Sequence, residues 1–171
     1  MVNGERELSD NPHRKITMKT FLSSLLIAFI LSSAVLAEDL KPYQHGDWQK
    51  LITTNPQRPL VVHFWGVTCG PCIKEMPLWG SFIKNNRSLN IIFVQVDNVP
   101  IDQMIKMLSK ANLQTANNYY LNSHFDERLR YEINPKWRGE TPMTLVIEKD
   151  NKQTLKIGNT DFVLLKKQVF N

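Results

Sequence analysis

Two cysteines constrain this chain more than any other feature, because they stand between an apolar run and a helix-compatible run. Cys69 and Cys72 are the only cysteines among the 171 residues. Residues 60–65 predict a buried strand, and the residues from Gly70 to about Asn85 predict a helix. This order places the sulfur of Cys69 at a helix N-terminus, where unpaired N–H groups and the helix dipole stabilise an anion. The pKa of such a thiol falls from about 8.5 into the range of about 3.5–7.5, which makes it a nucleophile near neutral pH.

Cys72 follows Cys69 by one helical turn and is placed to attack a mixed disulfide formed at the first thiol. We therefore predict that Cys69 is the attacking thiol and Cys72 the resolving thiol. A metal site is the alternative, since a CxxC pair is half of a zinc site and two thiolates can bind Cu(I). No second pair of cysteines or histidines stands at matching spacing. We predict no metal or cofactor, and keep a copper-binding chaperone or carrier as a second hypothesis and an interaction domain as a third.

The stretch from Phe64 to Pro77 (FWGVTCGPCIKEMP) resembles the active-site segment of thioredoxin-fold thiol–disulfide oxidoreductases. Its last four residues, KEMP, most resemble the exported TlpA/ResA-like branch. The resemblance covers roughly residues 40–170 and implies an α/β, thioredoxin-like three-layer fold, with a central mixed β-sheet and helices on both faces. It also implies that Cys69 and Cys72 form a redox-active disulfide.

A second short motif, Thr141-Pro142, precedes a predicted strand. Only about 5–6% of X–Pro bonds are cis in folded proteins, so the residues alone predict a trans bond. The resemblance implies the opposite, namely a cis-proline that lies against the CxxC motif. By the same resemblance, Thr141 and Pro142 form the substrate-binding pair, with the residue before the proline offering backbone groups to the substrate chain.

Two positions depart from the resembled pattern. Thioredoxins usually carry a buried Asp at the place of His63, and the TlpA/ResA-like branch often has Asn. A buried histidine could take the proton of Cys72, since its ordinary pKa of about 6.5 suits proton transfer near neutrality. The alternative is a core histidine bonded to a backbone carbonyl. Thr68 stands where many thioredoxins have Trp, which removes an apolar contact surface. We expect Glu75 to face solvent without a role.

Hydrophobic periodicity predicts the remaining elements. We expect a short helix over residues 47–52, a strand over 89–96, a helix opened by Pro100, a strand over 117–121 and a short helix around residues 125–129. Strands over 143–148 and 153–157 form a hairpin, and a last helix starts at about Asp161. Two long crossovers followed by a hairpin predict a mixed sheet. The aromatic residues Tyr119, Tyr120 and Trp137 are open to two interpretations, a partner surface or core.

The N-terminal segment predicts export. Residues 20–37 contain no charge, follow Arg14, Lys15 and Lys19, and end in Val-Leu-Ala. This is the pattern of a secretory signal. We predict an N-terminal extension plus signal peptide over residues 1–37, cleaved after Ala37, and a thioredoxin-like domain over residues 38–171. The alternative is an uncleaved anchor in the inner membrane, facing the periplasm.

Composition narrows the function further. The formal charge of +5 is spread along the chain without a block of like charges, so we predict no nucleic-acid partner. We predict an exported, periplasmic and monomeric thiol–disulfide oxidoreductase that acts on disulfide-bearing envelope proteins. The Gly-Pro dipeptide resembles that of reducing thioredoxins, and the resemblance implies apocytochrome c as one substrate. In an oxidising compartment such a reductase needs a membrane thiol reductase as its electron donor.

Overall fold

The computed structural model describes residue 1 and residues 40–170. The chain divides into two units, residues 1–37 and residues 38–171. The predicted extension and signal peptide, with the cleavage site after Ala37, lie outside the described residues. In the part of the chain that the structure describes, no helix has the length and apolar character needed to cross a membrane.

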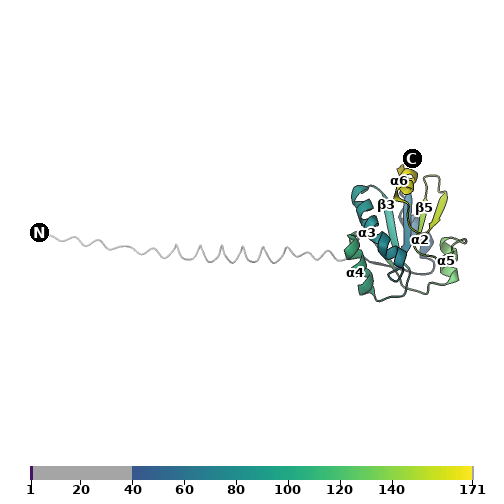
Figure 1. The fold of residues 1–171 in the computed structure, drawn as a ribbon, viewed down its shortest axis with the longest axis horizontal. Coiled ribbons are helices and arrows are strands. Elements are labelled where there is room, and N and C mark those ends of the chain that lie inside the picture. The colour runs from purple at the N-terminus through teal and green to yellow at the C-terminus, as the bar shows by residue number, and fades with distance from the viewer. Residues whose placement is uncertain (2–39, 171) are drawn as a thin grey trace. The chain divides into compact units, whose positions relative to one another are not determined.

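A six-stranded mixed sheet forms the centre of the second unit, in the order β1-β4-β3-β2-β5-β6. Strands β1, β4, β3 and β2 are parallel neighbours, whereas β5 pairs antiparallel with β2 and with β6. Figure 1 shows the elements. In chain order they are β1 (Lys41–Tyr43), α2 (Asp47–Thr54), β2 (Leu60–Trp65), α3 (Gly70–Asn85), β3 (Asn90–Gln95), α4 (Ile101–Ala111), β4 (Asn117–Leu121), α5 (Glu127–Ile133), β5 (Met143–Ile147), β6 (Gln153–Ile157) and α6 (Phe162–Phe170).

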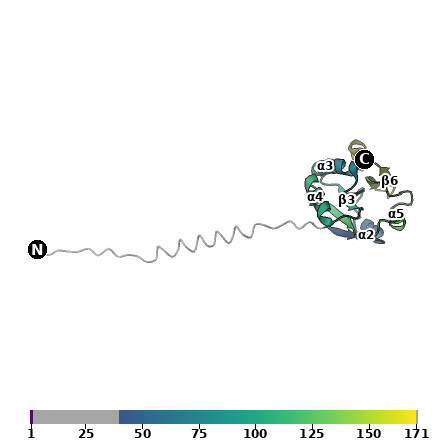
Figure 2. The same ribbon diagram turned by 60° about the horizontal axis from the view of Figure 1, so that its bottom comes forward.

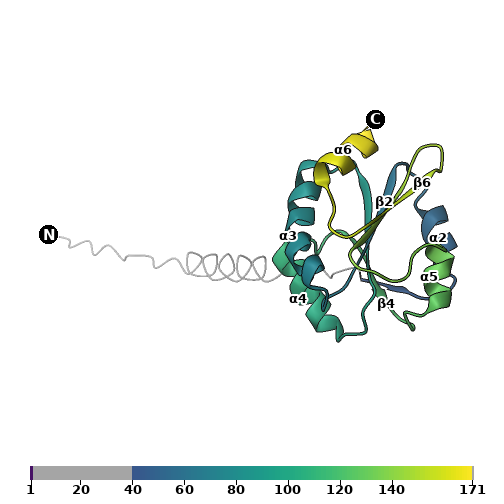
Figure 3. The same cartoon turned by 45° about the vertical axis from the view of Figure 1, so that its right-hand side comes forward.

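Helices cover both faces of the sheet, because side chains point to alternate faces along each strand. Helices α3, α4 and α6 lie on one side and α2 and α5 on the other, as Figure 3 shows; the turned view of Figure 2 separates α3 and α4 from α2 and α5 in the same way. In β2, Val61 and Trp65 pack into the core under the first group, and Val62 and Phe64 into the core under the second. The predicted three-layer α/β fold is confirmed.

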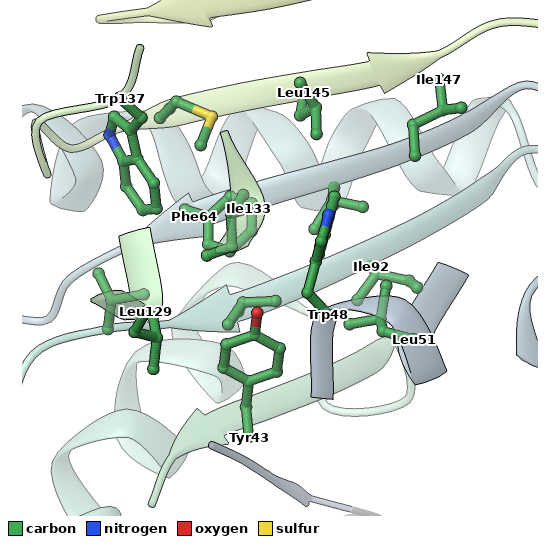
Figure 4. Packing of buried hydrophobic residues seen from close by; sticks show 14 of the residues in the cluster. Tyr43, Trp48, Leu51, Phe64, Ile92, Leu129, Ile133, Trp137, Leu145 and Ile147 are labelled. Atoms are coloured by element: carbon green, nitrogen blue, oxygen red, sulfur yellow. The ribbon is translucent and has the colours of Figure 1, made fainter. Parts of the chain in front are cut away.

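Aromatic rings pack among aliphatic side chains in the core under α2 and α5, which Figure 4 shows from close by. Phe64 of β2 packs between Trp48 and Trp137, with ring centroids 6.1 and 4.9 Å apart. The indole N–H of Trp137 donates to the carbonyl of Glu140 at 2.9 Å, and the side chain is buried. Trp137 is therefore a core residue rather than part of a partner surface. This core supports β2 from the face opposite the cysteines.

The sheet has one strand that the sequence pattern did not predict. Strand β1 pairs in parallel with β4 at the edge of the sheet. Its three residues contain a single buried apolar side chain, Tyr43, and three residues are too few to show a period. The strand forms because β4 offers it unpaired backbone groups along an open edge. Such a long-range partner leaves no signal in the local sequence.

Helices α3 and α4 touch at Gly80. A Cβ atom added there would lie 1.8 Å from the carbonyl oxygen of Ala111, closer than any real contact. Glycine at position 80 therefore allows the backbones of the two helices to approach each other. This contact matters for the site, because α3 carries both cysteines at its other end.

We expect Gly80→Ala to lower the free energy of unfolding by about 3 kcal/mol, because the obstacle is backbone rather than a flexible side chain. Urea unfolding followed by circular dichroism measures the change. Gly70→Ala is the matched control, since a Cβ atom at Gly70 meets nothing within 4 Å and its urea midpoint should stay near that of the parent. Equal midpoints for the Gly80 variant and the parent would contradict the close approach.

Candidate active site

The C-terminal end of β2 leads directly into the cysteine turn. After Trp65 the chain turns through Gly66, and the N–H of Cys69 donates to the Gly66 carbonyl at 3.4 Å. Cys69 then takes the N-cap position of α3, where its Sγ accepts from the backbone N–H of Cys72 at 3.2 Å. The predicted position of Cys69 at a helix N-terminus is confirmed. An anionic sulfur there would gain from the N–H group and from the dipole of α3.

The two cysteines differ in their access to solvent. A disulfide joins Cys69 to Cys72. Cys72 is fully buried, whereas Cys69 is partly exposed and is flanked by exposed Thr68 and Gly70. An incoming thiol or disulfide can therefore reach the sulfur of Cys69 but not that of Cys72. This asymmetry is what a mixed-disulfide mechanism needs, because the attacking and the resolving sulfur must differ in exposure.

The Thr141-Pro142 motif lies against the disulfide. The peptide bond between these residues is cis, as the resemblance implied. The carbonyl oxygen of Thr141 is 3.4 Å from Sγ of Cys69. Pairing of β5 with β2, in which Met143 is opposite Phe64, carries the motif to the end of β2. The structure thus brings together the two motifs that are separated by about seventy residues; substrate binding by Thr141 and Pro142 stays a prediction.

His63 is buried on the α3 side of β2 and has a hydroxyl partner. Its Nδ1 is 3.0 Å from Oγ1 of Thr144, and its ring packs against Trp79, with ring centroids 4.8 Å apart. Burial lowers the pKa of His63 to about 3, so the ring is neutral near pH 7. Its other nitrogen, Nε2, has no hydrogen-bond partner among the described residues. The core alternative expected a backbone carbonyl as partner, and the structure has the Thr144 hydroxyl instead.

The expectation for Glu75 was wrong. Its side chain is 2% exposed, and Oε1 accepts from the indole N–H of Trp79 at 2.8 Å. The second oxygen, Oε2, is buried without a partner in the described part of the chain. The spacing could have indicated this burial: Cys72, Glu75 and Trp79 stand at i, i+3 and i+7 on one helix face. The prediction weighed the charge of Glu75 and overlooked the face it occupies.

Asp97, which follows β3, also belongs to the site although no motif singled it out. Its Oδ2 accepts from both the backbone N–H and the hydroxyl of Thr68, at 2.7 and 2.9 Å. The parallel pairing of β2 with β3, with Trp65 opposite Gln95, brings the two strand ends to the same edge of the sheet. The expected loss of an apolar surface at Thr68 is thus accompanied by a new polar contact.

The residues that the structure describes contain no group of three or more His, Cys, Asp or Glu side chains placed to hold a metal ion. The two sulfurs are joined to each other and would become metal ligands only after reduction. The copper-carrier hypothesis stays a prediction.

Comparison with known proteins agrees with this geometry. The Thioredoxin family model matches residues 39–116, a segment that holds β2, both cysteines and β3. A comparison with curated protein sequences gave no significant match.

Several solved structures resemble the chain in fold. A secreted disulfide oxidoreductase of Mycobacterium tuberculosis, homologous to E. coli DsbE, is 20% identical and superposes with a TM-score of 0.51 over 65% of this chain and 79% of that chain. A putative thiol:disulfide interchange protein DsbE from Chlorobium tepidum is 15% identical and superposes with a TM-score of 0.51 over 69% of this chain and 82% of that chain. A thioredoxin-related protein from Neisseria meningitidis serogroup B is 21% identical, with a TM-score of 0.51 over 64% of this chain and 80% of that chain. At these identities the likeness shows a common fold.

The family match and the structure point to the same pair of sulfurs. The matched segment contains the disulfide, and Cys69 presents its sulfur at the N-terminus of α3 beside a cis-proline. From these observations we conclude that the chain is a thiol–disulfide oxidoreductase with a thioredoxin fold.

Proposed function

We propose that the chain is an exported reductase of protein disulfides in the cell envelope, of the TlpA/ResA-like kind. The observation that carries the proposal is the unequal exposure of the two sulfurs, with Cys69 open beside Thr141-Pro142 and Cys72 fully buried. A dithiol enzyme of either direction that works through a mixed disulfide needs one sulfur that the substrate can reach and a second, shielded sulfur that attacks the mixed disulfide. The Gly-Pro dipeptide between the cysteines supports the reducing direction.

In the proposed reaction, the Cys69 thiolate attacks one sulfur of a substrate disulfide. The substrate S–S bond breaks, one substrate thiolate leaves, and a mixed disulfide joins Cys69 to the other substrate sulfur. The Cys72 thiolate then attacks Sγ of Cys69 and releases the second substrate thiol. Two electrons pass from the dithiol to the substrate, and the Cys69–Cys72 disulfide remains. Thr141 is proposed to pair its backbone with an extended substrate segment during these steps.

Resolution requires Cys72 to lose a proton in a buried position, where the charged thiolate is disfavoured. Two buried bases occupy the same side of the sheet, His63 and Glu75. The pKa of His63 near 3 means that protonating it at pH 7 would cost about 5 kcal/mol. Glu75 is one helical turn from Cys72 and has one unpartnered oxygen. We propose that the proton passes to one of these two groups; the cost of protonating His63 and the unpartnered oxygen of Glu75 favour Glu75.

The cellular setting is part of the proposal. The uncharged segment over residues 20–37, with basic residues before it, supports export with cleavage after Ala37, and an uncleaved anchor is the alternative. One of the similar structures belongs to a protein described as secreted. In the periplasm, a monomeric reductase of apocytochrome c or of another envelope protein would need electrons from a membrane thiol reductase. The domain proposed for this role spans residues 38–171.

The reduction potential tests the direction of the reaction. We expect a value below about −220 mV, on the side of reducing thioredoxins, when the protein is equilibrated with a glutathione buffer. Cys69→Ala should abolish insulin reduction, and Cys72→Ser should accumulate the mixed disulfide. A potential near −120 mV would overturn the reductase proposal. Stoichiometric Cu(I) binding by the reduced protein without any insulin reduction would favour the copper carrier instead.

The proton acceptor can be identified by two matched substitutions. Glu75→Gln keeps an oxygen that accepts from Trp79 and removes the basic carboxylate, and we expect it to slow resolution at pH 7 by about tenfold or more. His63→Asn should slow resolution by less than about threefold, because the neutral ring is a poor base. Stopped-flow release of the second substrate thiol measures both rates. The reverse order of the two effects would assign the proton to His63.

Burial of neutral His63 also makes stability depend on pH. The pKa of His63 is about 3 in the folded protein, whereas an unfolded histidine has a pKa of about 6.5, so the unfolded chain binds more protons between these values. Stability contributed by the neutral ring is therefore complete above pH 6.5 and is lost as pH falls toward 3. We expect the parent to lose about 2 kcal/mol more than His63→Asn between pH 6.5 and 5. Urea unfolding at several pH values measures this, with exposed His124→Asn as the control; parallel curves for parent and His63→Asn would refute it.

A further inference from the structure

The carboxylate of Asp97 accepts two hydrogen bonds from the turn that carries Cys69. Thr68 directly precedes Cys69, and both of its polar donors, the backbone N–H and the hydroxyl, bond to Oδ2 of Asp97. The donor–acceptor distances, 2.7 and 2.9 Å, are those of strong hydrogen bonds to a charged acceptor. The contact joins the end of β3 to the cysteine turn, which are neighbours only through the pairing of β3 with β2.

The carboxylate is itself held in place. The side-chain amide of Gln95 donates to Oδ1 and to the backbone carbonyl of Asp97, and Gln95 is 3% exposed. A Cβ atom at Gly66 would lie 3.1 Å from Oδ2, so the glycine leaves the space that the carboxylate fills. Both oxygens of Asp97 therefore have partners from the surrounding chain. The surrounding hydrogen bonds therefore hold the Asp97 carboxylate in one orientation.

We propose that Asp97 is a positioning residue for Cys69, which fixes the cysteine turn through Thr68 and opposes the Cys69 thiolate with its negative charge. The first part follows from the chain of contacts. Asp97 accepts the hydrogen bond of the Thr68 N–H, and the N–H of Cys69, the next residue, donates to the carbonyl of Gly66 and closes the turn. These contacts hold Sγ of Cys69 at the N–H of Cys72. A looser turn would leave the sulfur less well aligned with α3 and with Thr141.

The second part follows from electrostatics. A nearby like charge disfavours a thiolate, whereas the N-terminus of α3 favours it. Asp97 thus moderates the thiolate stabilisation that the helix supplies, and a less stabilised reduced form is the more reducing one. The adjoining segments also carry exposed Lys74 and buried Glu75 on α3, and exposed Arg138 and Glu140 in the loop before Thr141. The functional benefit of a more reducing disulfide rests on the proposed reducing role, whereas the effect of Asp97 on the pKa of the Cys69 thiol does not.

Two substitutions of Asp97 separate charge from geometry. Asp97→Asn keeps an oxygen that accepts from Thr68 and removes the charge, while its amide –NH2 takes the place of the oxygen that accepts from Gln95. We expect it to raise the iodoacetamide alkylation rate of Cys69 at pH 6 about threefold, by lowering the thiol pKa. It should also shift the equilibrium constant against glutathione about threefold toward the reduced form. Asp97→Ala removes charge and clamp together, and kcat/KM for insulin reduction should fall about tenfold.

Changes at Thr68 test the link itself. Thr68→Val removes the hydroxyl donor and leaves the charge of Asp97, so kcat/KM should fall by about threefold. Thr68→Ser keeps the hydroxyl donor and should keep the kcat/KM of the parent. Asp150→Asn is the matched charge control, because Asp150 is an exposed residue of the β5–β6 hairpin, at the end of β5 remote from Pro142. Its alkylation profile, equilibrium constant and rate should equal those of the parent.

The outcomes divide clearly. An unchanged alkylation profile and equilibrium constant in Asp97→Asn would overturn the electrostatic role, and an unchanged kcat/KM in folded Asp97→Ala would overturn the positioning role. Circular dichroism establishes folding for each variant, and the isosteric Asn variant tests the charge if the Ala variant unfolds. A reduction potential of the parent of about −120 mV would refute the reductase proposal but not the role of Asp97. The role of Asp97 is tested by comparing the alkylation of Cys69 in parent and variant, which does not depend on the direction of the reaction.

Discussion

The pairing of β2 with its two neighbours is the constraint on which the rest of the site depends. Parallel pairing with β3 and antiparallel pairing with β5 bring three chain segments to the C-terminal end of β2. One segment supplies the cysteine turn, one supplies Asp97 and one supplies Thr141-Pro142. Because β2 is buried at all six positions between two apolar cores, its end is held rigidly. Strand pairing and burial of β2 therefore position the sulfur that follows it.

The two sides of the disulfide offer different physical environments. Toward solvent, Cys69 contacts backbone groups of α3 and Thr141, and it follows Thr68, which bonds to the carboxylate of Asp97. Toward the core, Cys72 lies among apolar and aromatic side chains, with His63 and Glu75 as buried ionisable groups of that region. The outer environment tolerates an anion and the inner one disfavours it. This difference separates the attacking step from the resolving step, since the second thiol must first give its proton to a base.

Much of the fold could be predicted from local patterns, because strands and helices with a continuous apolar face announce themselves by their period. Strand β2, helix α3 and the β5–β6 hairpin lie where periodicity and turn residues placed them. Strand β1 could not be found this way, since only its pairing with β4 makes it a strand. In the site, the prediction for Glu75 failed because residue type was weighed above helix face. The partner of His63 was missed because Thr144 lies across the sheet on β5.

The sequence by itself determined the reactive groups and their local setting. Two cysteines one turn apart at a helix start already specify a nucleophile, a resolving thiol and an electrostatic reason for thiolate formation. Only the tertiary structure decided which groups surround them. The hydrogen bonds of Asp97 to Thr68, the approach of Thr141 to Cys69 and the contact of His63 with Thr144 all depend on pairing and packing between segments far apart in the chain. Local propensity acts over a few residues, whereas strand register and core packing act across the whole domain, and for that reason these contacts leave no mark in the sequence around the motif.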